Sequence, residues 1–297
     1  MGTRCTKRNR NRFRIIGVVC TVLILAVTLG ILVFMKNEKA EPFVGNSKKQ
    51  PPKTAHISID DATMIFQDIW WHEYDSIFDN EILGTLQELH EKYGVKVTLY
   101  VFGELEEFAI WDFPLTYKSE FRENADWLQI GFHSGADCDP EEDYASFKEF
   151  TEDYERVESA LWRLAGGDSV TSVLRLHNWY ATEEMTAYLE TQGITALLCR
   201  DNEEVSYDLT KEQAEELYAS RDGKLETEEM TYYATDLRLE KTEDITAALE
   251  EHKKDRVIII FTHAWSFEEN SEKLEEAVQW LLQEEYQFSD LQPVVEE

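Results

Sequence analysis

Four predicted strands of this 297-residue chain end in polar side chains that could take part in hydrolysis. These side chains are Asp60 and Asp61, His133 and Asp137, Arg175 and His177, and Thr262 and His263. In parallel α/β folds the carboxyl ends of the strands meet at one rim, and active sites gather there. We therefore expect these residues to lie close together.

Carboxylate and imidazole groups in this pattern could bind a metal ion. His133 and Asp137 are four residues apart, so one helical turn would place both on one face. With Asp61 they would form a three-ligand site with an open position, the layout of a catalytic metal site. A metal held in this way lowers the pKa of its bound water to about 7 and polarises a carbonyl. Asp60 would remain as general base and His263 as general acid.

Each of these features also has a structural explanation when it is taken alone. An Asp-Asp pair after a strand is usually a turn or capping feature, and a His-x-x-x-Asp spacing is common by chance. A histidine that follows an apolar strand, as His263 does, is usually a satisfied structural residue. The ordered set on four strand ends is what favours a functional site.

In this order the strand ends resemble the motifs of the polysaccharide deacetylase family, carbohydrate esterase family 4. The segment 58–62 (Ser-Ile-Asp-Asp-Ala) is similar to the family's Thr-Phe-Asp-Asp-Gly motif. The segment 133–137 (His-Ser-Gly-Ala-Asp) is similar to its His-Ser/Thr-x-x-His motif. Arg175 matches the arginine that opens a third motif, and His263 matches the histidine that ends the last one. The resemblance covers roughly residues 54–285.

The resemblance implies a fold and a role for each matched residue. The fold would be a distorted, incomplete β/α barrel. Asp60 would be the catalytic base, Arg175 would orient it, and His263 would protonate the leaving amine. The implied metal ligands are Asp61, His133 and, by substitution, Asp137.

The chain departs from the family pattern at several positions. Ala62 replaces the glycine of the first motif, and His177 follows Leu176 where the third motif has a proline. Asp137 replaces a histidine, which makes the ligand set harder than the usual one. Zinc is the first expectation, and this change adds manganese, iron or cobalt as alternatives.

No segment matches the family's fourth motif well, and Asp201 and Asp236 are the candidates for it. Aromatic residues follow three of the strand ends as well, and their rings would suit the faces of sugars. The candidate substrate-binding residues are Trp179, Tyr180 and Trp265. The alternative is that these rings belong to the core.

Alternating strands and helices must position these residues. The predicted strands are 55–59, 95–102, 127–132, 172–176, 194–199, 230–239 and 257–261. The predicted helices are 80–93, 141–164, 182–191, 242–253 and 271–284. The strand 257–261 (VIIIF) is fully apolar, as strands buried on both faces are. Repeated β-α units of this kind predict one α/β domain over residues 54–297, with helices covering a parallel sheet or barrel.

The N-terminal region predicts a membrane anchor. Residues 15–35 carry no charge, and 21 helical residues span about 32 Å, the thickness of a hydrocarbon core. Residues 1–14 contain six basic residues and no acid, so they should stay cytoplasmic and the domain should lie outside. A cleaved signal peptide is the alternative, but its apolar core would be shorter. The polar segment 36–53 is typical of a flexible linker.

Composition excludes some partners. The chain has 29 Lys and Arg against 60 Asp and Glu, a net charge of −31, which argues against nucleic acid or anionic lipid as a ligand. The sequence indicates no protein partner. Cys138 and Cys199 would lie outside the membrane, either as one disulfide or as two free thiols.

The leading hypothesis is a membrane-anchored, metal-dependent hydrolase that removes acetyl groups from N-acetylated cell-surface polysaccharide. Two alternatives remain open at this point. One is a catalytically decayed domain of the same fold that binds glycan or serves as a scaffold. The other is a metal-dependent hydrolase of a different amide or ester.

Overall fold

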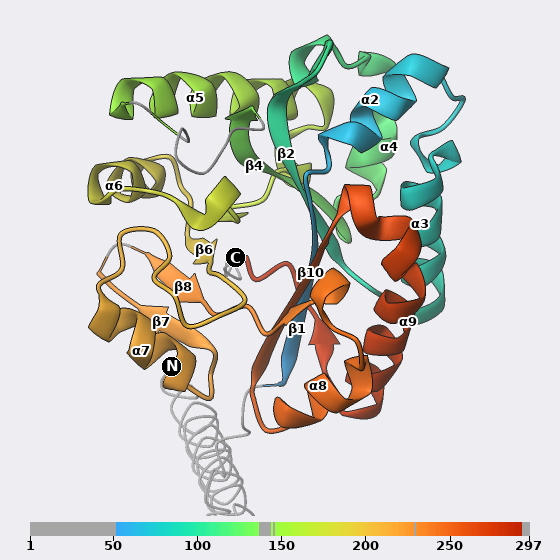
Figure 1. Cartoon of the computed structure of the whole chain (residues 1–297). Coiled ribbons are helices and arrows are strands. Elements are labelled where there is room, and N and C mark those ends of the chain that lie inside the picture. The colour runs from blue at the N-terminus through green and yellow to red at the C-terminus, as the bar shows by residue number, and fades with distance from the viewer. Residues whose placement is uncertain (1–51, 137–143, 145, 229, 293–297) are drawn as a thin grey trace, which may run out of the picture. The chain divides into compact units, whose positions relative to one another are not determined.

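Figure 1 shows the computed structural model of the chain, which describes residues 52–136, 144, 146–228 and 230–292. The predicted anchor, most of the linker, Asp137 and Cys138 lie outside these residues. In the described ranges, no helix combines the length and apolar character needed to cross a membrane. The chain divides after Pro51, and the unit Pro52–Glu297 holds all the elements named below.

The main sheet is built around β1 (Thr54–Asp60), which pairs in parallel with β2, β10 and β11. β2 also pairs in parallel with β4 and antiparallel with β3, and β10 pairs in parallel with β9. The bounds are β2 (Val97–Leu105), β3 (Phe108–Ala109), β4 (Leu128–Ala136), β9 (Leu237–Arg238), β10 (Val257–His263) and β11 (Gln287–Phe288). The apolar run in β10 is buried, as its sequence predicts.

A smaller sheet has the order β5-β6-β8-β7. Its strands are β5 (Val173–Leu174), β6 (Ala196–Leu198), β7 (Lys224–Glu226) and β8 (Thr231–Tyr233). The first three in this order are parallel, and β7 is an antiparallel edge strand. A bridge between Ile130 and Val170 connects β4 to the segment that leads into β5.

Helices cover the main sheet, with α2, α3 and α9 together on one side and α5 on the other (Figure 1). The bounds are α2 (Thr63–His72), α3 (Glu81–Tyr93), α4 (Lys118–Glu123), α5 (Phe147–Leu164), α6 (Glu183–Thr191), α7 (Lys211–Ala219), α8 (Ile245–Glu251) and α9 (Phe267–Gln283). Local sequence sets the ends of α3. Asn80 caps it by accepting from the N–H groups of Ile82 and Leu83, and Gly94 ends it with a left-handed φ of 72°.

The predicted α/β class is confirmed, while the barrel is only partly matched. The described strands form two sheets, and no closed barrel is present among them. The predicted strand 230–239 divides into β8 in the smaller sheet and β9 in the main sheet. Asp236 explains the division, because its N–H donates to Ile259 O and its carboxylate accepts from Ile259 N–H. These bonds direct the chain from one sheet to the other.

Three α-helices of the described residues, α2, α4 and α7, were absent from the sequence prediction. α7 begins with a capping box between Thr210 and Gln213, a signal that the sequence does carry. α2 has no side-chain cap at Ala62, so its start has no such signal. Cys199 is buried and is a free thiol among the described residues. Because Cys138 lies outside them, the choice between a disulfide and two free thiols stays open.

Candidate active site

The parallel register of β1 and β10 brings the first pair of site residues together. Asp60 and His263 end these strands as direct register partners. Asp61 follows β1 with a left-handed φ of 53°, which aspartate tolerates better than most residues do. The chain therefore turns at Asp61, and both neighbouring carboxylates face the same rim, although successive residues of a strand point in opposite directions.

His133 reaches this rim through an irregularity in β4. The pairing of β2 with β4 shifts register after Val101, so that Phe102 pairs with Ser134 and His133 is the extra residue. Bulges of this kind are common beside active sites, where they redirect a side chain. His133 is buried, and its Nδ1 makes a hydrogen bond with the carbonyl oxygen of Arg175. Nε2 is then left facing Asp61, at 3.4 Å from Oδ1.

Asp60 forms a buried ion pair with Arg175. The Arg175 Nε atom lies 3.3 Å from Asp60 Oδ2, and both side chains are almost fully buried. The guanidinium also donates to the carbonyl oxygen of Cys199 at 3.2 Å and to Thr235 Oγ1 at 2.9 Å. Burial raises the pKa of Asp60, and Arg175 opposes that rise. A carboxylate with a raised pKa is suited to general base catalysis near neutral pH.

Ligand atoms of Asp61, His133 and His177 lie within 4.8 Å of one another. Two imidazoles and one carboxylate are a donor set that zinc binds, and that iron, cobalt or manganese can also bind. Among the described residues, the contact that Asp61 Oδ1 makes with a side chain is the one with His133 Nε2, at 3.4 Å, so this buried oxygen can also accept a metal ion. Burial alone would raise the pKa of Asp61, but the hydrogen bond with His133 and its charge lower it to about 2. The residues present therefore fit a divalent metal.

His177 had no assigned role in the sequence-based prediction, which took Asp137 as the third ligand. Asp137 lies outside the described residues, so its role stays a prediction. His177 begins a short helical turn, His177–Trp179, in which Asn178 and Trp179 both have a left-handed φ of 54°. Two such residues in succession are strained, and strained backbone is typical of functional sites. This turn directs His177 toward His133, with the two ring centroids 5.3 Å apart.

Glu240 is a further site residue that sequence reasoning missed. It lies in a short turn, Leu239–Lys241, directly after β9. Its Oε1 accepts from His263 Nδ1 and from Arg238 Nε, and its Oε2 accepts from Thr262 Oγ1 at 3.0 Å. Burial would raise the pKa of Glu240, but the hydrogen bond with His263 and its charge lower it to about 2. An ionised Glu240 therefore orients His263 so that Nε2 faces Asp61 Oδ2 at 4.0 Å.

The two candidates for the fourth motif have other contacts. Asp201 pairs with Lys241 at 3.5 Å, and Asp236 pairs with His252 at 3.2 Å. Neither lines the cavity at the site. Glu240 contacts His263 instead, and it was not considered because the split between β8 and β9 cannot be read from the sequence.

The site encloses a cavity of about 160 Å³. Its walls are Asp60, His133, Arg175, Leu176, His177, Asn178, Trp179, Arg238 and His263. Trp179 is thus placed at the site, whereas Tyr180 is 41% exposed and lines no part of this cavity. Trp265 is 58% exposed and covers the rim, where its Nε1 donates to Asp61 Oδ2 at 2.8 Å and its ring stacks on His263.

Comparisons with known proteins give matches to solved structures alone. No protein-family profile and no curated protein matches the sequence. The catalytic domain of peptidoglycan N-acetylglucosamine deacetylase from Eubacterium rectale ATCC 33656 matches with 14% identity over 82% of this chain and 90% of its own, at a TM-score of 0.44. A family 4 carbohydrate esterase from Bacillus anthracis matches with 14% identity over 80% of each chain, at a TM-score of 0.39. At this identity and these TM-scores, neither likeness assigns a family or an activity to this chain.

Proposed function

We propose that this chain is a metal-dependent hydrolase that removes acetyl groups from N-acetylated cell-surface polysaccharide. One observation supports this proposal most strongly. The buried Asp60–Arg175 pair, the donor cluster of Asp61 with two histidines, and the His263–Glu240 pair surround one rim of the fold. A base, a metal-binding set and an acid in one site are suited to metal-assisted hydrolysis of an amide.

Each group would have a distinct task. A divalent metal held by Asp61, His133 and His177 would supply Lewis acidity toward the acetyl carbonyl and the attacking water. Asp60 would accept the proton of that water. His263 would give a proton from Nε2 to the departing amine.

The supporting residues would keep the base and acid in place. Arg175 would hold the Asp60 carboxylate in position through its ion pair. Glu240 would hold Nδ1 of His263, so that Nε2 stays directed toward the site. Loss of either support should therefore impair turnover more than metal binding.

Acetate release from acetylated chito-oligosaccharides or peptidoglycan, measured with several divalent metals, tests the activity. The neighbouring variants Asp60→Asn and Asp61→Asn separate the roles. Asp60→Asn should keep metal binding nearly intact and lower turnover by about 100-fold or more, the usual loss for a general base. Asp61→Asn should weaken metal binding, because a neutral amide is a poor ligand. If no metal supports acetate release, or if Asp60→Asn is as active as the parent, the proposal is wrong.

We also propose zinc as the first metal to be tried in the activity assay. A separate proposal concerns the membrane: residues 15–35 hold the domain on its outer face. The uncharged span behind six basic residues supports this topology. Protease added to intact cells should digest residues 54–297. Full protection of that region would reverse the topology.

A further inference from the structure

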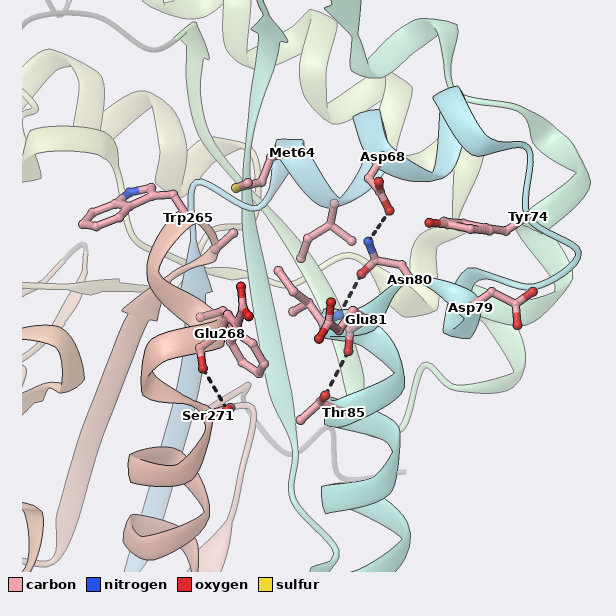
Figure 2. Close-up of a pocket in the computed structure, with 14 residues that line it drawn as sticks. Met64, Asp68, Tyr74, Asp79, Asn80, Glu81, Thr85, Trp265, Glu268 and Ser271 are labelled. Carbon is pink, nitrogen blue, oxygen red and sulfur yellow. Dashed lines mark hydrogen bonds between the residues drawn. The ribbon is translucent and has the colours of Figure 1, made fainter.

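A second cavity adjoins the candidate active site. It has a volume of about 520 Å³ and lies between the first turns of α2, α3 and α9 (Figure 2). Its size is that of many small-ligand sites, which range from about 300 to 1,000 Å³. We call this cavity the acidic groove. The residues that line it include Met64, Ile82, Trp265 and Phe267, together with four carboxylates.

The chain passes directly from the active site into the walls of the acidic groove. Asp61 ends the turn after β1, and Met64 in the next helix lines the groove. His263 ends β10, and Ala264 and Trp265 after it line the groove as well. Trp265 contacts both the candidate active site and the acidic groove, because its Nε1 donates to Asp61 and its side chain forms part of the groove wall. A polymer chain with one unit at Asp61 would therefore extend its next units into the acidic groove.

The charge of the lining limits what can bind. The four carboxylates are Asp68, Asp79, Glu81 and Glu268, and no Lys, Arg or His is among the described lining residues. Asp68 is partnered by Asn80 Nδ2 at 2.8 Å, and Asp79 accepts from Ser76 N–H. Glu81 and Glu268 are exposed and extend toward the space between α3 and α9 (Figure 2). Two carboxylates at a partly apolar wall favour a cationic ligand that also has an apolar face.

We propose that the acidic groove binds a de-N-acetylated amino sugar of the same glycan chain on which the active site acts. The ring of such a sugar has an apolar face for the partly exposed side chains of Met64 and Ile82 in the groove lining. Its free amine is an ammonium at neutral pH and pairs with Glu81 and Glu268. This inference rests on the proposed function, since removal of acetyl groups creates that ammonium. The enzyme would then act best on chains that are already partly deacetylated.

Calorimetric titration of the full chain, with a chelator present so that no acetate is released, tests binding in the acidic groove alone. The probe is a glucosamine tetramer, and fully N-acetylated chitotetraose is the uncharged control of the same length. The parent should bind the glucosamine tetramer more tightly, in a salt-dependent way. The double variant Glu81→Gln/Glu268→Gln should weaken that binding by about fivefold, as loss of two exposed charge pairs implies. The same variant should leave binding of chitotetraose unchanged.

A matched variant removes two exposed carboxylates elsewhere, Glu184→Gln/Glu212→Gln, and should bind the glucosamine tetramer as the parent does. Equal weakening by both double variants would mean general attraction to an acidic protein and would overturn the inference. Tetralysine binding that is as tight as that of the glucosamine tetramer, with the same response to the Glu81/Glu268 change, would also overturn it. These titrations need no turnover. If the chain binds the glucosamine tetramer but releases no acetate, the proposed activity is wrong, while the proposed binding in the acidic groove stands.

Discussion

The side chain of Arg175 crosses from the end of β5 in the smaller sheet to Asp60 at the end of β1 in the main sheet. Its Nε lies 3.3 Å from Asp60 Oδ2, and both side chains are buried. Its other bonds, to Cys199 O and Thr235 Oγ1, remain beside the smaller sheet. Arg175 is therefore both the partner of the candidate base and a direct link between the two sheets.

Replacement of Arg175 by alanine should lower the free energy of unfolding by about 3–5 kcal/mol, because it leaves a buried carboxylate without its partner. Urea denaturation at neutral pH measures this loss. Arg221→Ala is the matched control, since Arg221 is exposed, and should change stability by less than about 0.5 kcal/mol. A loss below about 1 kcal/mol for Arg175→Ala would show that the pair does not link the sheets.

Much of the fold could be predicted from sequence because local signals were strong. The apolar run of β10 and the helical periodicity of α3 each identify their element directly. Asp60, Arg175 and His263 could be found because a polar residue at the end of an apolar strand is conspicuous. The register that joins Asp60 to His263 then brought two of them together.

Glu240 could not be found in the same way, and His177 was named as a strand-end residue but without a role as a metal ligand. Glu240 reaches His263 only because the chain leaves β8 for a second sheet before it forms β9, a tertiary event. His177 is directed inward by the left-handed backbone of Asn178 and Trp179, neither of which is a glycine. The residue types alone do not predict that left-handed backbone conformation.

Glu240 should act through His263 and not on the substrate. Glu240→Gln should lower kcat by about 100-fold or more, since loss of an orienting carboxylate lets an imidazole adopt the wrong tautomer. KM and metal binding should stay near the parent values, and Glu240→Asp should restore part of the activity. Acetate-release kinetics with a parallel metal titration check this. A fall in metal affinity equal to the fall in kcat would contradict the positioning role.

His56 should make the fold sensitive to acid. It is buried in β1, and burial lowers its pKa from 6.5 to about 4 despite a hydrogen bond with Ser289 O. Below pH 6.5 the His56 side chain binds a proton in the unfolded chain but not in the folded chain. The contribution of His56 to the free energy of unfolding therefore falls as the pH drops to 4. The full loss is roughly 3 kcal/mol.

Urea denaturation between pH 7 and pH 4 gives the slope of stability with pH. His56→Gln should have a shallower slope than the parent over that range, because it removes the titrating group. Parallel slopes for the parent and His56→Gln would show that His56 does not cause the sensitivity.

The third metal ligand has two candidates, His177 and Asp137, of which the structure describes only His177. The structure places His177 within reach of Asp61 and His133, whereas the resemblance implies Asp137. His177→Ala should weaken the binding of zinc or cobalt by more than the roughly 10–100-fold that loss of a supporting partner costs. It should also reduce the rise in melting temperature that saturating metal produces, because a ligand stabilises only the state that binds it. Asp137→Ala should change both quantities much less.

Metal titration followed by the absorption of bound cobalt reports the ligand set directly, without activity. His72→Ala removes an exposed imidazole and should leave the spectrum unchanged. If Asp137→Ala alters the cobalt spectrum and His177→Ala does not, the third ligand is Asp137, and the His177 turn only lines the cavity. If neither variant nor a chelator affects metal content or melting temperature, the cluster does not hold a metal. The same rim of carboxylates and histidines would then need a different explanation.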